Sequence, residues 1–387
     1  MIEIGIDEFT VVLQLNDFLK SEVNTQNWHK VARSIIEMFS DKVGMIEVFG
    51  EINPVNKKLP AGYTNGFEFG IHDFYVMAAY HEYRFDMGIV IKFSAQALGY
   101  YCDSKGVKPY SMLQMAQDDN YTVRLSRVDL TVDYINEGLS VTKLYKRLIQ
   151  KKVAVFREEE TEKNNDKYYR RVDLQIKGIC RGDSVPTIYL GSPRSSVRLR
   201  VYDKRLEQIE RKGNKLDKTI NCADWVRFEG VFRNEYAHQI GMALLNMKND
   251  EDYIDLIAST MLQKYRFKNI NKGVAGNDTR FTKKLISCIR TKSCILRSDI
   301  SRNYDLARSI KYLIDSSGLV STLYKIISIW GEEKAEEFYK LISKEVSEYV
   351  PNEDVYVWLR KNQAEYMGKY PDFSAFIASI VPSSKKP

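Results

Sequence analysis

The chain has 387 residues, a net charge of +7 and 44% hydrophobic residues, which is typical of a globular protein long enough for two domains. No run of about 18 apolar residues is present and the N-terminus lacks the features of a signal peptide, so we expect neither a membrane span nor secretion. The five cysteines form no Cys-x-x-Cys pair. This argues against a zinc site or a disulfide framework and favours a reducing cytoplasm.

Strands with intervening helices are predicted for the first 245 residues. Alternating apolar residues with Gly or Asp turns indicate strands at 4–15, 45–51, 64–71, 74–82, 86–94, 123–134, 168–178, 186–191, 196–204 and 224–234. Three of them follow in quick succession between 64 and 94, which predicts an antiparallel meander. Helices are predicted at 25–39 and, capped by Ser140, at 141–149. Residues 157–167 form a polar connection.

From Glu235 onward the pattern is helical. Apolar residues recur at helical spacing in 306–314, in 319–330 and from 332 to about 346. The fold class predicted is α+β: an antiparallel-sheet core flanked by helices, with a mainly helical C-terminal region. The predicted domains are 1–245, which holds the sheet, and 246–387, a helical and basic region.

Positive charge is concentrated between residues 262 and 311, which hold thirteen Lys or Arg against three Asp, a net of +10. Clustered positive charge next to aromatic residues attracts nucleic-acid phosphates. The alternative is a solvated helix face. The candidate DNA-binding residues are Lys264, Arg266, Lys268, Lys272, Arg280, Lys283 and Lys284.

Three predicted strands carry charged or reactive side chains on a single face. Because side chains alternate along a strand, residues two apart point the same way. The three sets are Arg127, Asp129, Thr131 and Asp133 on the first strand, Arg198, Arg200 and Tyr202 on the second, and Arg227, Glu229 and Arg233 on the third. Together they resemble a nuclease active site, although each Asp or Glu could equally form an ordinary cross-strand ion pair.

Carboxylate oxygens are suitable ligands for Mg²⁺ or Mn²⁺. Asp129 and Asp133 lie four residues apart on one strand face, about 13 Å by strand rise, so both cannot ligate one ion without a bulge or a bridging group. Asp129 with Glu229 is therefore the expected metal pair, and Asp133 is expected to be a supporting group or the partner of an arginine or lysine.

Five blocks spread over residues 1 to about 340 resemble the replication initiation factor family of rolling-circle plasmids, which also includes relaxases of some integrative conjugative elements. The blocks are Ile4–Phe9, Val90–Leu98, Ser126–Asp133, Thr187–Lys204 and Val226–Glu229 with Arg233. Ala95 stands where the family usually has glycine. Only four histidines occur and none forms a His-hydrophobe-His triplet, which excludes the metal motif of the histidine-based rolling-circle nucleases.

The resemblance implies an enzyme in which residues 1–245 form a metal-dependent domain that nicks DNA through a tyrosine and residues 246–387 form an accessory region for DNA recognition. Tyr202, one of 25 tyrosines, would attack the phosphate, remain linked to its 5′ side and leave a 3′ hydroxyl as primer. Tyr189, in the same block, is the alternative nucleophile. A free tyrosine has a pKa near 10, so nearby cations must stabilise its phenolate and hold the phosphate. These cations are Arg198, Arg200, Lys204, Arg227 and Arg233.

The resemblance also implies the partners: a double-stranded or hairpin origin, single-stranded DNA, a host helicase and a second copy of the chain, in a bacterial cytoplasm. One alternative is a conjugative relaxase that nicks an origin of transfer. The chain begins almost at its first predicted strand, which favours replication. The alternative from another class is a non-catalytic origin-binding repressor.

Overall fold

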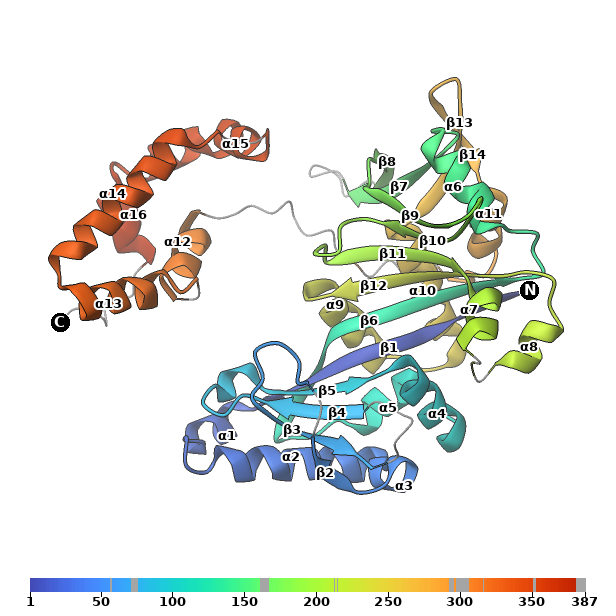
Figure 1. Cartoon of the computed structure of the whole chain (residues 1–387), viewed down its shortest axis with the longest axis horizontal. Coiled ribbons are helices and arrows are strands. Elements are labelled where there is room, and N and C mark those ends of the chain that lie inside the picture. The colour runs from blue at the N-terminus through green and yellow to red at the C-terminus, as the bar shows by residue number, and fades with distance from the viewer. Residues whose placement is uncertain are drawn as a thin grey trace. The chain divides into compact units, whose positions relative to one another are not determined.

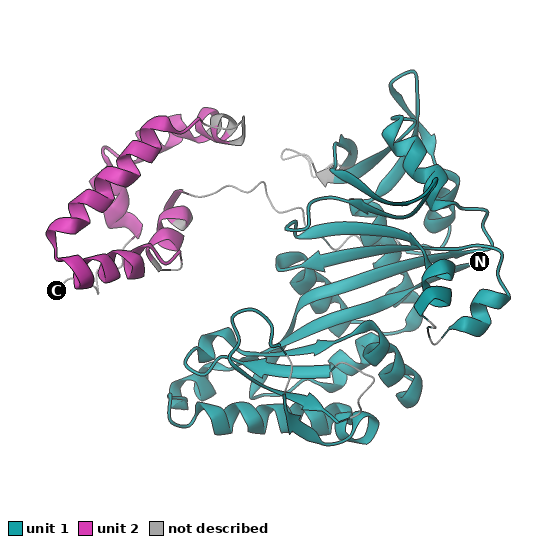
Figure 2. Ribbon diagram, viewed as in Figure 1, with its two compact units in different colours: residues 1–297 teal, residues 298–387 magenta. Residues whose placement is uncertain are grey.

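The computed structural model describes residues 1–55, 58–70, 76–160, 167–211, 213, 215–291, 296, 306–315, 317–350 and 353–380. The chain divides into two compact units, residues 1–297 and 298–387 (Figure 2). Unit 1 contains both sheets of the described structure, and unit 2 contains helices alone. All residues predicted to take part in chemistry or DNA binding lie in unit 1.

The larger sheet of unit 1 has ten antiparallel strands in the order β2-β3-β4-β5-β1-β6-β12-β11-β10-β9 (Figure 1). The long central strands β1 and β6 pair along almost their whole length. The bounds are β1 Ile2–Leu15, β2 Ile52–Pro54, β3 Asn65–Phe69, β4 Val76–Tyr80, β5 Ile89–Phe93, β6 Tyr121–Ile135, β9 Ile176–Arg181, β10 Ser184–Leu190, β11 Val197–Asp203 and β12 Trp225–Arg233.

A smaller antiparallel sheet has the order β14-β13-β7-β8. Its strands are β7 Val153–Glu160, β8 Lys167–Val172, β13 Arg266–Asn271 and β14 Val274–Asp278. Lys272 and Gly273 connect β13 to β14, and both have positive φ, as a tight hairpin turn requires.

Helices cover the face of the larger sheet that forms the core. Helix α9 packs on β6 and β12, and α10 packs on β1, β6 and β7. A Cβ at Gly230 would lie 2.6 Å from the sulfur of Met261, so glycine permits this close packing of β12. The helices of unit 1 are α1 Asp17–Glu22, α2 Trp28–Val43, α3 Met45–Phe49, the 3₁₀ turn Phe85–Met87, α4 Ala95–Lys105, α5 Pro109–Met115, α6 Val141–Ile149, α7 Lys204–Arg211, α8 Leu216–Ile220, α9 Glu235–Leu245, α10 Asp250–Lys264 and α11 Arg280–Ile286.

Unit 2 consists of α12 Leu306–Asp315, α13 Leu319–Trp330, α14 Glu333–Glu348, α15 Glu353–Lys369 and α16 Phe373–Ile380. Successive helices α12, α13 and α14 pack on one another, and α16 packs on α12. The ring of Phe376, a buried residue, lies within 6 Å of the rings of Tyr366 and Tyr370 and forms a small aromatic core.

The α+β class is confirmed, and most predicted strands are present. The meander between 64 and 94 is formed by β3, β4 and β5, and Ser140 caps α6 with its hydroxyl as predicted. The strand predicted at 168–178 is wrong as one unit, because it divides into β8 of the smaller sheet and β9 of the larger. The polar connection predicted at 157–167 contributes to β7 and β8, and residues 161–166 lie outside the described part.

The strand predicted at 45–51 is wrong, because Met45–Phe49 forms helix α3. Gly44 has a left-handed conformation that ends α2 and lets the chain turn into the new helix. Met45, Val48 and Phe49 are buried, at the i, i+3 and i+4 spacing of a helix face. The alternating pattern that suggested a strand is too short to distinguish the two periods.

The mainly helical C-terminal region also contains a hairpin, because residues 266–278 form β13 and β14. Tyr265 and Phe267 are buried while Arg266 and Lys268 are partly exposed, which is the alternation of a strand. The predicted division at 245 falls within unit 1, where α10 packs against β1 and β13 pairs with β7. No helix among the described residues is long and apolar enough to span a membrane.

Candidate active site

The three predicted polar faces lie side by side on one face of the larger sheet. In the strand register, Tyr202 of β11 is opposite Arg227 of β12, which is opposite Asp133 of β6. In the next row, Arg200 is opposite Glu229. Directly opposite residues share a sheet face, so the antiparallel register itself assembles this cluster.

Tyr202 is 4% exposed, and its hydroxyl donates a hydrogen bond of 3.2 Å to Oε2 of Glu229. The same oxygen accepts a hydrogen bond of 2.6 Å from Arg200, whose guanidinium lies 4.3 Å from the centre of the Tyr202 ring. Burial raises the pKa of Tyr202 well above its ordinary value, and Glu229 raises it further. Tyr202 is therefore a neutral phenol, and its hydroxyl is already hydrogen-bonded to a proton acceptor, the carboxylate of Glu229.

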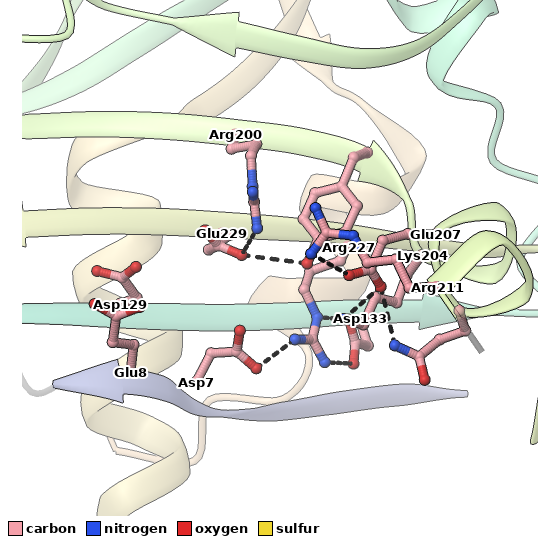
Figure 3. A network of polar contacts seen from close by, with 12 residues as sticks. Asp7, Glu8, Asp129, Asp133, Arg200, Lys204, Glu207, Arg211, Arg227 and Glu229 are labelled. Atoms are coloured by element: carbon pink, nitrogen blue, oxygen red, sulfur yellow. Dashed lines mark hydrogen bonds and ion pairs between the residues drawn. The ribbon is translucent and has the colours of Figure 1, made fainter. Parts of the chain in front are cut away.

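Arg227 forms the centre of the buried ion pairs in Figure 3. Its Nε and Nη2 donate to the two carboxylate oxygens of Asp133 at 2.7 and 2.8 Å, and its Nη1 donates to Asp7 at 2.5 Å. Burial lowers the pKa of Arg227, but Asp133 and Asp7 outweigh this effect and raise it. Arg227 is 4% exposed and Asp133 is 4% exposed, so this bidentate pair is a structural feature of the sheet.

Six carboxylates border one cavity of about 580 Å³, and four of them lie on the central strands: Asp7 and Glu8 of β1, Asp129 of β6 and Glu229 of β12. Burial raises the pKa of Asp129 to about 6, although Arg127 holds it at 2.6 and 2.9 Å. Burial likewise raises the pKa of Glu8 and of Glu229, and like charge among the four adds to the effect. Negative charge is therefore crowded here (Figure 3).

Cations line the same cavity. Arg200, Lys204 and Arg227 border it together with Tyr202. Lys204, at the start of α7, pairs with Glu207 at 2.8 Å and lies 5.6 Å from the centre of the Tyr202 ring. The cavity therefore offers a phenol, carboxylates and positive charge within one partly open space.

The donor chemistry of the cavity suits a hard divalent ion, because its carboxylates repel one another and a cation would relieve that repulsion. Among the described residues, however, no three His, Cys, Asp or Glu side chains converge as a preformed metal site. Asp129 pairs with Arg127 and Glu229 with Arg200. Asp133 is the partner of Arg227 and is not among the residues that line the cavity.

Arg198 and Arg233, predicted as catalytic, do not line the cavity. Arg233 donates to the main-chain oxygens of Ser195 and Pro193 at 3.1 and 3.5 Å. The guanidinium of Arg198 lies 4.2 Å from the centre of the Tyr189 ring. Tyr189 is also absent from the lining of the cavity, which leaves Tyr202 as the better placed of the two candidate nucleophiles.

A family model described as replication initiation factor matches residues 123–342, more than half of the chain. The chain belongs to this family. It is 27% identical over 219 residues to the "Putative DNA relaxase NicK" of Bacillus subtilis (strain 168), a match that covers 55% of each protein, so the chain spans about half the length of this curated relative. A solved structure of a rolling circle replication initiator protein from Geobacillus stearothermophilus has 18% identity and a TM-score of 0.48, over 76% of this chain and 100% of that one.

The family resemblance predicted from the five blocks is thus confirmed. The matched span includes Asp129, Tyr202 and Glu229. Asp7 and Glu8 lie before it, and residue-by-residue reasoning missed both as site residues. The sequence signal for both was the pair of adjacent acidic residues in the opening strand block. In the structure, the pairing of β1 with β6 shifts register between Ile6 and Glu8, which leaves Asp7 without a partner in β6 and places it beside Arg227.

The predicted DNA-binding residues lie on and around the β13–β14 hairpin and α11. Lys272 and Lys283 are exposed, and so is Arg280, which lies 3.9 Å from Glu137. Lys284 also pairs with Glu137, Arg266 pairs with Asp278 at 2.6 Å, and Lys268 lies 5.5 Å from the centre of the Phe156 ring. Lys264 is 6% exposed and lies 4.2 Å from the centre of the Tyr236 ring, a position that does not suit a DNA contact.

Proposed function

We propose that the chain initiates rolling-circle replication by nicking one strand of an origin through Tyr202. The observation that carries this proposal is the hydrogen bond from the Tyr202 hydroxyl to Glu229 inside a cavity that Arg200 and Lys204 also line. A nucleophile joined to a base and flanked by cations is the arrangement that phosphoryl transfer requires. Membership of the replication initiation factor family supports the same chemistry.

In the proposed reaction, the phenol oxygen of Tyr202 forms a bond to phosphorus while the bond from phosphorus to the 3′ oxygen breaks. The phenol proton passes to Glu229, whose raised pKa improves it as a base. A proton then returns to the 3′ oxygen, so the step conserves protons and leaves a 3′ hydroxyl. Arg200 and Lys204 offset the charge that builds on the phosphoryl oxygens.

Glu8, Asp129 and Glu229 are the residues that would hold Mg²⁺ or Mn²⁺, with Asp7 adjacent. When bound, such an ion would polarise a phosphoryl oxygen of the scissile group. Binding would require Asp129 and Glu229 to loosen their contacts with Arg127 and Arg200, which frees both arginines for phosphate. Asp133 is proposed to orient Arg227 and not to ligate the ion.

The proposed partners are origin DNA, as duplex, hairpin or single strand, a host helicase and a second copy of the chain. For origin DNA we propose the surface formed by Lys272, Arg280, Lys283 and Lys284 with Arg266 and Lys268. Three members of this surface, Arg280, Lys283 and Lys284, border a shallow depression of about 540 Å³ together with Asn269, Asn277, Asp278 and Ser287. Lys264 is left out because it is buried.

Covalent capture tests the proposed reaction. Wild type, Tyr202→Phe and Tyr189→Phe are incubated with labelled single-stranded origin DNA and Mn²⁺, and the products are separated on a denaturing protein gel. A labelled protein band is expected for wild type and Tyr189→Phe and not for Tyr202→Phe. A band that persists in Tyr202→Phe would assign the nucleophile elsewhere. Binding without a band in any of the three would favour the non-catalytic repressor.

A conjugative relaxase is the second candidate, favoured by the name of the Bacillus subtilis relative. The chemistry at Tyr202 would be the same, and the DNA would be an origin of transfer. Supplying the protein in trans separates the two roles. An initiator sustains replication of a plasmid that carries its origin, whereas a relaxase mobilises a plasmid that replicates by other means.

A further inference from the structure

Arg198 and Arg233 are neighbouring arginines that lack an acidic partner. Among the described residues, neither forms an ion pair with a carboxylate: Arg233 binds main-chain oxygens, and the described contact of Arg198 is with the Tyr189 ring. The nearby Arg127 is different, because Glu8 and Asp129 hold it at 2.9 and 2.6 Å. Two of the three arginines thus have no carboxylate within ion-pair distance among the described residues, although Asp129 and Glu8 attract Arg233 from farther away.

The two arginines lie close enough to repel. Arg198 is opposite Val231 on the site face of the sheet, one row away from Arg233. Burial lowers the pKa of Arg233, and the charges of Arg127 and Arg198 lower it further against the opposing charges of Asp129 and Glu8. The Nε atom of Arg198 is buried and has no hydrogen-bond acceptor. A bound anion would relieve the repulsion and satisfy this donor.

This pair is separate from the site of bond cleavage. Arg198 and Tyr202 are four residues apart on β11, about 13 Å by strand rise. Arg233 and Arg227, which is opposite Tyr202, are six residues apart on β12, about 20 Å by the same measure. By main-chain position, Arg198 is therefore two rows and Arg233 three rows of the register away from Tyr202.

We propose that Arg198 and Arg233 bind a second backbone phosphate of the same DNA strand, away from the scissile phosphate. This inference rests on the proposed DNA-nicking function, and it differs from the sequence-based expectation that these two arginines act on the scissile group. Its consequence is that the strand runs across β11 and β12 from the cavity to the loop at residues 192–196. Arg198 and Arg233 would hold and position the strand and would take no part in bond breaking.

Salt dependence of binding tests the second phosphate site. Binding of a fluorescent single-stranded thymidine oligonucleotide is measured against salt concentration in a Tyr202→Phe background, which removes cleavage. Each lost phosphate contact reduces the slope of log K against log salt by roughly 0.7. We expect Arg198→Gln/Arg233→Gln to reduce the slope by roughly 0.7 to 1.4, and Arg198→Lys/Arg233→Lys, which keeps both charges, to restore most of it.

The matched control is Arg33→Gln/Arg84→Gln, which removes two exposed arginines that pair with Glu37 and Asp86 outside the site face. An equal slope in this control and in Arg198→Gln/Arg233→Gln would overturn the proposal. So would an equal effect of the site variant on an oligonucleotide with uncharged methylphosphonate linkages. Because binding is measured without cleavage, failure here leaves the covalent-capture result untouched.

In the wild-type tyrosine background, a second readout separates positioning from chemistry. Arg198→Gln/Arg233→Gln should raise the KM for nicking of single-stranded origin DNA with little change in kcat. Arg200→Gln, which removes a cation from the cavity, should lower kcat. A fall in kcat without a change in KM for the Arg198 and Arg233 variant would place both arginines in the chemical step and contradict the proposal.

Discussion

The phenol oxygen of Tyr202 lies 3.2 Å from Oε2 of Glu229, although the two residues are 27 positions apart in the chain. They belong to adjacent strands and occupy neighbouring rows of the register, so the pairing of β11 with β12 fixes this contact. The acceptor is buried and has a raised pKa, and its second hydrogen-bond donor is Arg200. This hydrogen bond makes Glu229 a candidate general base as well as a candidate metal ligand.

Replacing Glu229 with glutamine should abolish the base while preserving the shape of the site. We expect Glu229→Gln to lower the rate of covalent capture by about 10²–10⁴-fold, the usual contribution of a general base. Single-turnover measurements with labelled single-stranded origin DNA give this rate. Glu3→Gln is the matched control, because Glu3 is on the same sheet face, opposite Asp133, and does not line the cavity. A wild-type rate for Glu229→Gln would exclude the role as a base.

The raised pKa of Asp129 predicts how stability changes with pH when a chelator keeps the site free of metal. Burial raises this pKa from an ordinary value near 3.8 to about 6, against the attraction of Arg127. The folded protein then holds this proton more tightly than the unfolded chain, so the contribution of Asp129 to stability is largest below pH 4 and is lost as pH rises to 6. This lost contribution to the free energy of unfolding is about 3 kcal/mol, because each unit of pKa difference corresponds to about 1.36 kcal/mol.

Asp129→Asn should lack this part of the pH dependence and be more stable than wild type above pH 6. Urea unfolding of both proteins at a series of pH values measures the difference. Asp217→Asn, at an exposed position of α8, controls for loss of a surface charge. Parallel pH profiles for wild type and Asp129→Asn would show that Asp129 ionises normally.

Mn²⁺ should stabilise the folded protein by binding among the crowded carboxylates. We expect the melting temperature of wild type to rise with Mn²⁺, and to rise more at pH 8 than at pH 5, because protonated Asp129 and Glu229 are poor ligands. Differential scanning fluorimetry measures the shift. Asp129→Asn should lose most of it, whereas Asp217→Asn should keep it. An undiminished shift in Asp129→Asn would place the ion elsewhere.

Asp133 is expected to matter for stability and not for metal binding. Asp133→Asn weakens a buried bidentate pair with Arg227, and breaking such pairs destabilises proteins by about 3–5 kcal/mol. Chemical denaturation gives the change in unfolding free energy. The Mn²⁺ shift of the melting temperature, taken on the folded variant, should match that of wild type. If Asp133→Asn lost the Mn²⁺-induced rise in melting temperature while its unfolding free energy stayed unchanged, Asp133 would instead be a metal ligand.

The exposed lysines of the β13–β14 hairpin and α11 should contribute to duplex binding. Each of Lys272→Gln and Lys283→Gln is expected to reduce the salt slope of binding to a duplex origin by about 0.9, the value for one phosphate contact. Lys146→Gln, in the last turn of α6, is the control for charge at another exposed position. If these lysine variants and Lys146→Gln have equal slopes, the hairpin is not the DNA surface.

The sequence alone was enough to place the residues of the site on strands. Over the stretches of β6, β11 and β12 that carry the site residues, apolar residues alternate with polar ones, and in a strand this period of two places the polar side chains on one face. The blocks that contain Asp129, Tyr202 and Glu229 also identified the family. The same local evidence failed at Met45–Phe49, because a run of five residues fits both a strand and a helix.

Only the tertiary structure decided which charged groups meet. Asp133 is bound to Arg227, Asp129 to Arg127, and Asp7 joins the cluster because of a register shift in β1. Periodicity determines the face on which a side chain lies, but it does not determine which strands are neighbours or how they are aligned. Strand order and register are set by contacts across the whole core. This order and register place Tyr202 beside Glu229 and place Arg198 farther along the sheet from Tyr202.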